Sequence, residues 1–236
     1  MKKLIEGLHK FHHTYYNRQR ELFERLASGQ HPEALFITCS DSRIDPNLLT
    51  QTRPGEIFTL RNAGNIVPPY GAVGGGEDAT IEYAVAVLGV RHIIVCGHSQ
   101  CGAMKATLGP ETLGALPAVA AWLTHAEAAR GHVLKTHHGL ADEDLLGRLT
   151  EQNTLAQLEH LRTHPAVTAK LATGEVQLHA WVYHIQAGTV AAYDESRGEF
   201  DALIAPDGVA AKQETVRKTA APRSSQRGQA ATGQTN

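Results

Sequence analysis

The chain has 236 residues, of which 42% are hydrophobic and 19% are charged, as in an ordinary globular protein with one large domain. A formal net charge of −2 suggests no nucleic-acid or anionic-membrane partner, and no apolar stretch approaches the roughly 20 residues of a membrane span. Three cysteines do not suit a disulfide framework, and the charged, His-rich start lacks the apolar core of a secretory signal. We therefore expect a cytoplasmic protein with reduced thiols.

The first part of the chain predicts a helix followed by two strands. Apolar residues recur near a 3.6-residue period over residues 1–28, which predicts an amphipathic helix that a glycine and a proline end. The apolar run at 34–38 is short and bounded by turn residues, as is typical of a strand buried on both faces. After a Pro-Gly turn, residues 56–60 predict a second strand.

Beyond a loop rich in glycine and proline at 68–76, helices and strands are expected to alternate. Apolar, β-branched runs indicate the strands, and alternating polar and apolar residues around Gly188 predict a hairpin. In chain order we expect a helix at 78–88, a buried strand at 92–96, a helix at 102–108, mostly helical chain at 117–164, and hairpin strands at 176–185 and 189–193.

This order of elements predicts an α/β fold. Its centre would be a mostly parallel β-sheet with an antiparallel edge strand, flanked by helices and preceded by an N-terminal helical arm. We expect the arm at 1–32, the main domain at 33–208 and a disordered, weakly basic tail at 209–236, where Ala, Gln, Thr, Ser, Arg and Gly predominate.

Two cysteines and one histidine follow directly on two different expected strands. Cys39 ends the run at 34–38, while His98 and Cys101 follow the run at 92–96. Ligands of parallel sheets gather beyond the carboxyl ends of the strands, so these side chains should meet. Two thiolates and one imidazole make a three-ligand set for zinc, which leaves a fourth position open, as in catalytic sites. The sequence therefore predicts a catalytic zinc centre.

One acidic and one basic residue follow the first of these ligands closely in sequence. Asp41 is two residues after Cys39, and Arg43 two residues further, so in an extended stretch all three side chains leave on the same side. A carboxylate next to a zinc-bound hydroxide would accept its proton as a hydrogen bond, and an Arg would hold that carboxylate bidentately. Without its Arg, the same Asp would be free to ligate the zinc and close the site.

Other interpretations of the cysteines remain beside this one. Cys96 as a fourth ligand would make a closed structural site and leave Asp41 and Arg43 without a task, whereas a buried Cys commonly serves as a small hydrophobe. A phosphatase with a Cys nucleophile would need an Arg six residues after its Cys. Thr107 and Asp45 stand at that distance instead, which excludes this class.

Four segments resemble the β-class carbonic anhydrases: CSDSR from Cys39, RNAGNIVPPYG from Arg61, EYAV from Glu82 and VCGHSQCGAMK from Val95. The similarity covers about residues 1–205, and the chain is most similar to the cyanobacterial, carboxysome-associated branch and its bacterial relatives. The resemblance implies reversible hydration of CO2 to bicarbonate and a proton by zinc-hydroxide attack, with one Zn2+ per chain.

The resemblance also implies a role for individual residues. Cys39, His98 and Cys101 would be the metal ligands, and Asp41 and Arg43 the catalytic pair. In the plant-like members of the family, further residues line the CO2 pocket. One of them is an aromatic residue from the dimer neighbour, and another offers its backbone N–H near the substrate. In this chain the aromatic is Tyr83, the N–H belongs to Gly102, and the other pocket residues are Gln30, Phe58 and Ala63. Phe58 and Tyr83 could equally be ordinary aromatic residues of the core, without a role in the pocket.

One departure from the family concerns regulation. Some bacterial members bind a noncatalytic bicarbonate around a Trp three residues before the first Cys ligand. Phe36 stands there in this chain and lacks the indole N–H, although Arg61 is kept. We expect no such pocket, and we expect Asp41 to stay off the zinc near neutral pH.

The family also suggests partners. Its dimers wrap the N-terminal helix of one chain over its neighbour, so we expect a homodimer or a higher homo-oligomer, without nucleic acid or membrane. The basic tail would suit docking onto a carboxysome scaffold, which would make the location carboxysomal. An alternative function follows from this: a structural zinc-binding scaffold or adaptor that recruits partners through its tail.

Overall fold

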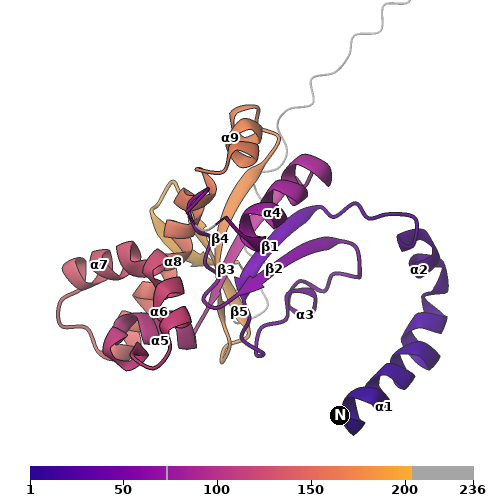
Figure 1. Cartoon of the computed structure of the whole chain (residues 1–236), viewed down its shortest axis with the longest axis horizontal. Coiled ribbons are helices and arrows are strands. Elements are labelled where there is room, and N and C mark those ends of the chain that lie inside the picture. The colour runs from indigo at the N-terminus through magenta and orange to yellow at the C-terminus, as the bar shows by residue number, and fades with distance from the viewer. Residues whose placement is uncertain (73, 204–236) are drawn as a thin grey trace, which may run out of the picture.

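The computed structural model describes residues 1–72 and 74–203, which build one six-stranded sheet with the order β2-β1-β3-β4-β5-β6 (Figure 1). The first four strands in this order are parallel, and the last two are antiparallel. This confirms the predicted α/β fold. The strands are β1 (Ala34–Cys39), β2 (Ile57–Asn62), β3 (His92–His98), β4 (Gln177–His184), β5 (Thr189–Asp194) and β6 (Glu199–Ala202).

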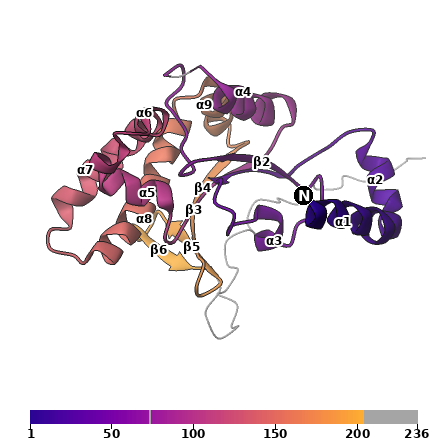
Figure 2. The same cartoon turned by 60° about the horizontal axis from the view of Figure 1, so that its bottom comes forward.

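Helices cover one face of this sheet and gather at one of its ends. Figures 1 and 2 both show α5 to α8 gathered on one side of the molecule and the arm of α1 and α2 on the other. The helical segments are α1 (Lys2–Lys10), η1 (Phe11–Tyr16), α2 (Arg20–Leu26), α3 (Pro46–Thr50), α4 (Gly76–Glu82), η2 (Tyr83–Val87), α5 (Gly102–Leu108), η3 (Pro110–Leu113), α6 (Pro117–Leu123), η4 (Thr124–Ala126), α7 (Glu127–Thr136), α8 (Asp142–Leu161) and α9 (Pro165–Ala172).

Alternate side chains of β1 enter two different cores. Leu35 and Ile37 pack with residues of α4, η2, α8 and α9 on the face of the sheet that helices cover. Phe36 points to the opposite face, where Trp181 of β4 packs edge-on against it at 6.0 Å between ring centroids. All six residues of β1 are buried, as the continuous apolar run predicted.

Gly97, directly before His98, lets a helix approach the sheet closely. A Cβ on Gly97 would lie 2.8 Å from Oγ1 of Thr154 and 3.0 Å from Cγ2 of Thr150. Both threonines belong to α8, so this helix packs directly on the end of β3. The lack of a side chain at Gly97 thus fixes α8 beside the residue that follows, His98.

Some elements differ from the expectations. A short helix, α3, begins at Pro46 after Asp45, whose side chain accepts from the N–H of Leu48 at 3.1 Å, and α9 begins at Pro165. Both starts follow the preference of helices for proline at the first position. Within the mostly helical chain expected at 117–164, the structure has the separate helices α6, α7 and α8, and β6 extends the hairpin by one strand. The expected helix at 1–28 includes a π-helical turn, η1.

The arm has no buried residue in α1, η1 or α2, and it stands apart from the sheet in both views (Figures 1 and 2). The predicted tail at 209–236 and the domain end at 208 lie outside the described residues. Within those residues, no helix combines the length and the apolarity that a membrane crossing requires.

Candidate metal centre

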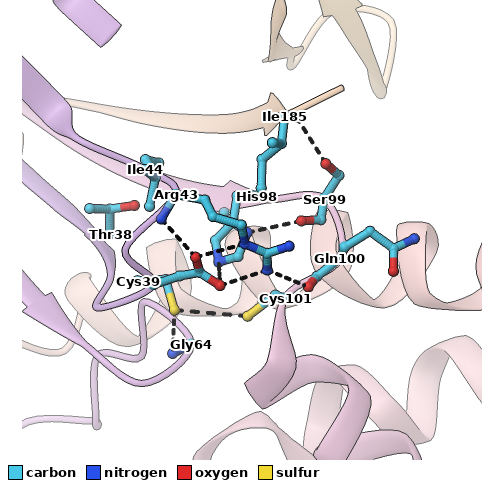
Figure 3. Close-up of polar contacts among 12 residues, drawn as sticks. Thr38, Cys39, Arg43, Ile44, Gly64, His98, Ser99, Gln100, Cys101 and Ile185 are labelled. Atoms are coloured by element: carbon cyan, nitrogen blue, oxygen red, sulfur yellow. Dashed lines mark hydrogen bonds and ion pairs between the residues drawn. The ribbon is translucent and has the colours of Figure 1, made fainter. Parts of the chain in front are cut away.

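Two strand ends bring the three predicted ligands together (Figure 3). Cys39 ends β1, His98 ends the neighbouring parallel strand β3, and Cys101 directly precedes α5. All three are buried, and their ligand atoms lie within 4.8 Å of one another. The two sulfurs are 3.9 Å apart. Two thiolates on a tetrahedral zinc would be about 3.8 Å apart, so the spacing fits this metal.

The imidazole of His98 is oriented for a metal. Its Nδ1 lies 2.9 Å from the carbonyl of Ser99, so this nitrogen carries the proton and donates it. In the neutral imidazole Nε2 is then the bare nitrogen, and it is buried without a hydrogen-bond partner among the described residues. A buried polar atom without a partner is rare in folded proteins, and a metal ion would satisfy it.

The two thiols influence each other's protonation. The hydrogen bond from Cys101 lowers the pKa of Cys39 to about 4, although burial opposes this effect. The N–H of Gly64, which lies 3.4 Å from the Cys39 sulfur, lowers it further. The same bond between the sulfurs, with burial, raises the pKa of Cys101. These contacts thus favour the thiolate form of Cys39, and the thiolate is the form that binds metals.

The third cysteine does not belong to this cluster. Cys96 packs with Phe36 in the core on the opposite face of the sheet, and burial raises the pKa of its thiol to about 12. It therefore remains protonated. In the described part of the chain, the group that suits a metal holds two thiols and one imidazole and no fourth protein ligand. Three protein ligands would leave the fourth position of a tetrahedral metal open, and an open catalytic centre stays a prediction.

Asp41 and Arg43 form a bidentate ion pair beside the cluster, and Figure 3 shows Arg43 next to the three candidate ligands. The Arg43 side chain donates from Nε to Oδ1 at 2.9 Å and from Nη2 to Oδ2 at 2.7 Å. Nη2 also donates to the carbonyl of Gln100 at 3.0 Å, which ties the pair to the Cys101 segment. The hydrogen bonds from Arg43 hold the pKa of Asp41 well below its usual range. Oδ2 lies 3.8 Å from Nε2 of His98, at the edge of the cluster.

Arg61 fixes the backbone that carries this ion pair. Its Nη2 donates to the carbonyls of Cys39 at 2.9 Å, Asp41 at 2.7 Å and Ile44 at 2.9 Å, and its Nε donates to Cys39 at 3.0 Å. Arg61 thus donates four hydrogen bonds to backbone carbonyls at the end of β1 and in the loop between β1 and α3. The expected absence of a noncatalytic bicarbonate pocket around Phe36 stays a prediction. In this structure the guanidinium of Arg61 bonds to the carbonyls of the loop.

The predicted CO2-pocket residues divide into two groups. Gly102 directly follows Cys101, and Ala63 precedes Gly64, whose N–H lies 3.4 Å from the Cys39 sulfur. Phe58 packs against Tyr83 with ring centroids 6.1 Å apart, but it pairs with a strand residue four positions before Cys39, or about 13 Å along the strand. Gln30 is exposed in the link between α2 and β1. A single chain therefore does not bring Gln30, Phe58 and Tyr83 to the metal ligands.

Other residues support the site without having been predicted. Trp122 of α6 donates from Nε1 to the carbonyl of Ala63 at 2.8 Å. Asn153 of α8 donates from Nδ2 to the carbonyl of Gly64 at 3.1 Å. The signal for α8 was present in the sequence, because polar residues recur there at helical spacing, but their partners are backbone groups that only the fold identifies.

Comparison with known proteins identifies the family of this chain. A family described as carbonic anhydrase matches residues 34–190. The carbonic anhydrase of Synechococcus elongatus is 52% identical over 191 residues, which cover 80% of this chain and 70% of the relative. The carbonic anhydrase of Pseudomonas aeruginosa is 50% identical over 203 residues, which cover 86% of this chain and 92% of the relative.

Solved structures agree as well. The β-carbonic anhydrase CcaA has a TM-score of 0.84 and 51% identity, covering 86% of this chain and 91% of its own. A tetrameric β-carbonic anhydrase of the ascomycete Sordaria macrospora has a TM-score of 0.74 and 28% identity, covering 81% and 95%. Sequence and fold agree over most of the length of these proteins, and the chain belongs to the β-carbonic anhydrase family of zinc enzymes.

Proposed function

We propose that this chain hydrates CO2 reversibly to bicarbonate and a proton at a zinc ion held by Cys39, His98 and Cys101. The bare, buried Nε2 of His98 beside two thiols is the observation that supports this assignment most directly. Zinc, when bound there, supplies a Lewis acid that lowers the pKa of water toward neutrality. Metal analysis of the purified protein should find one zinc per chain, and the same preparation should catalyse CO2 hydration. A protein without zinc that is fully active would contradict the proposal.

In this mechanism the Asp41–Arg43 pair orients the attacking oxygen. The carboxylate is ionised, because the hydrogen bonds from Arg43 lower its pKa, and it therefore only accepts hydrogen bonds. An oxygen nucleophile that donates its proton to Asp41 directs a lone pair elsewhere, toward CO2. Arg43 holds both carboxylate oxygens, and its bond to Gln100 prevents the pair from rotating away from the ligands.

The predicted CO2 pocket requires a second chain, and the arm offers a way to recruit one. Its apolar side chains are exposed and lie at helical spacing: Leu4, Leu8, Phe11 and Tyr15. The sheet face opposite the core helices holds a cavity of about 700 Å³ with an apolar floor that includes Phe36, Ile94 and Trp181. We propose that the arm of one chain covers this face of its partner, and that the dimer formed in this way brings Tyr83 of one chain to the CO2 pocket of the other.

Substituting Leu8 with aspartate should dissociate the oligomer, because it places a charge in the apolar stripe of the arm. Light scattering after size exclusion should show a lower mass, and CO2 hydration should fall by about 10-fold or more as the shared pocket is lost. His9→Asp adds the same charge on the adjacent, polar side of α1 and is the matched control. An L8D protein with the mass of the wild type would exclude the arm from the interface.

The alternative scaffold function concerns residues 209–236, outside the described part of the chain. Deleting residues 210–236 tests whether they recruit a partner such as a carboxysome scaffold. If they do, CO2 hydration should stay within about 2-fold of the wild type while co-purification of the partner is lost. Unchanged co-purification would exclude this role for the tail.

A further inference from the structure

One buried face of α8 carries polar side chains. Thr150, Asn153, Thr154 and Gln157 are each at most 2% exposed, and their spacing places them on one side of the helix. Buried amides are costly unless they are hydrogen-bonded, so the partners of this face indicate its purpose. The threonines bond to carbonyls of their own helix. The side-chain amides of Asn153 and Gln157 instead bond to residues outside the helix.

The amides form a ladder onto residues 63–67, which we call the thiolate loop. Asn153 Nδ2 donates to the carbonyl of Gly64 at 3.1 Å. Gln157 Nε2 donates to Oδ1 of Asn153 at 2.9 Å, and this bond fixes which end of the Asn153 amide faces the loop. Gln157 Oε1 accepts from the N–H of Val67 at 2.9 Å. Two points of the thiolate loop are thus tied to one helix face.

The other side of Gly64 faces the metal centre. Its N–H donates to the sulfur of Cys39 at 3.4 Å. Gly64 has a φ of +85°, and a Cβ would lie 3.0 Å from Ala103 and 3.1 Å from Met104, so the loop also packs tightly on α5. The carbonyl of Gly64, which bonds to Asn153, and the N–H of Gly64, which bonds to Cys39, belong to adjacent peptide groups. A shift of the carbonyl therefore also displaces the N–H.

We propose that Asn153 and Gln157 are positioning residues of the metal centre, which keep the Gly64 N–H directed at the Cys39 sulfur. This inference rests on the proposed role of Cys39 as a zinc ligand. A hydrogen bond to a ligating thiolate draws charge from the sulfur and tunes both the strength of the metal bond and the acidity of the metal. Neither amide touches the ligands, so they act through the loop.

Asn153→Leu tests the proposal, because it keeps the size of the side chain and removes its hydrogen bonds. The full-length variant is loaded with cobalt(II), whose charge-transfer band from sulfur reports the charge on the thiolate. The band should move to lower energy than in the wild type. Zinc competition with a chelator should show an affinity about 10- to 100-fold lower. Gln157→Met should act in the same direction and replaces Asn153→Leu if that variant does not fold.

The matched control is Thr150→Val, on the same buried face. It removes a hydroxyl that bonds only to the carbonyl of Leu146, so the cobalt band and the zinc affinity should stay at wild-type values. A folded N153L or Q157M protein that matches Thr150→Val in both measurements would overturn the positioning role. A wild-type protein that shows no sulfur-to-cobalt band would overturn the ligand assignment itself, and the positioning role with it.

Discussion

Replacing Cys101 with alanine is expected to remove zinc and CO2 hydration together. The substitution leaves one thiol and one imidazole, which is too few for a stable zinc site. Loss of an outer hydrogen bond to a metal ligand already costs about 10- to 100-fold in affinity or activity, so loss of a ligand should cost more than about 100-fold. Elemental analysis and a stopped-flow CO2-hydration assay on the same preparation measure both quantities.

Cys96→Ala is the control for this variant. Cys96 is also buried and free, and it lies in the strand that carries His98, but its sulfur belongs to the core on the other face of the sheet. The control should keep one zinc per chain and activity within about 2-fold of the wild type, with only the modest loss of stability that a small core truncation brings. A C101A protein that retains zinc and full activity would refute the proposed ligand set.

Asp41→Asn is expected to lower kcat by about 100-fold or more while zinc remains bound. An amide of the same shape carries no charge and presents a donor where the mechanism needs an acceptor. Arg43→Lys should have a smaller effect in the same direction, because one ammonium group cannot hold both carboxylate oxygens. Zinc content measured beside kcat separates this loss from the loss of the metal.

An ion pair far from the site provides the comparison. Glu175→Gln breaks the exposed pair between Lys170 and Glu175, whose charged atoms are 2.6 Å apart, and exposed pairs of this kind have small effects on stability. This variant should keep the activity of the wild type. Full activity in zinc-bound D41N would show that the carboxylate does not orient the nucleophile.

The strands that carry the site could be predicted because their signals are local. The apolar runs before Cys39 and after Arg91 are short and β-branched, and each ends at a chemically distinctive residue. Parallel pairing then brings their carboxyl ends together by a general rule of sheet topology. The helix α3 had a comparable signal in Asp45 and Pro46, which the prediction missed.

The support behind the ligands could not be predicted in the same way. The face of α8 shows polar residues at helical spacing, and such residues ordinarily lie on a solvated face. Only the packing of α8 on Gly97 reveals that Asn153 and Gln157 are buried and bonded to the loop backbone. The positions of Phe58 and Tyr83 are a different case, since their predicted role requires a second chain.

The wide separation of the ligands along the chain has a consequence for biosynthesis. Cys39 and Cys101 are 62 positions apart, so their meeting depends on the pairing of β1 with β3. Closing a loop of that length is entropically unfavourable, and the sheet hydrogen bonds must offset this before any ion can bridge the sulfurs. We therefore expect the pairing of β1 with β3, and not the metal, to bring the two sulfurs together, in contrast to a zinc finger, which is unfolded without its zinc. On this expectation the chain folds without the ion and presents an assembled site to it.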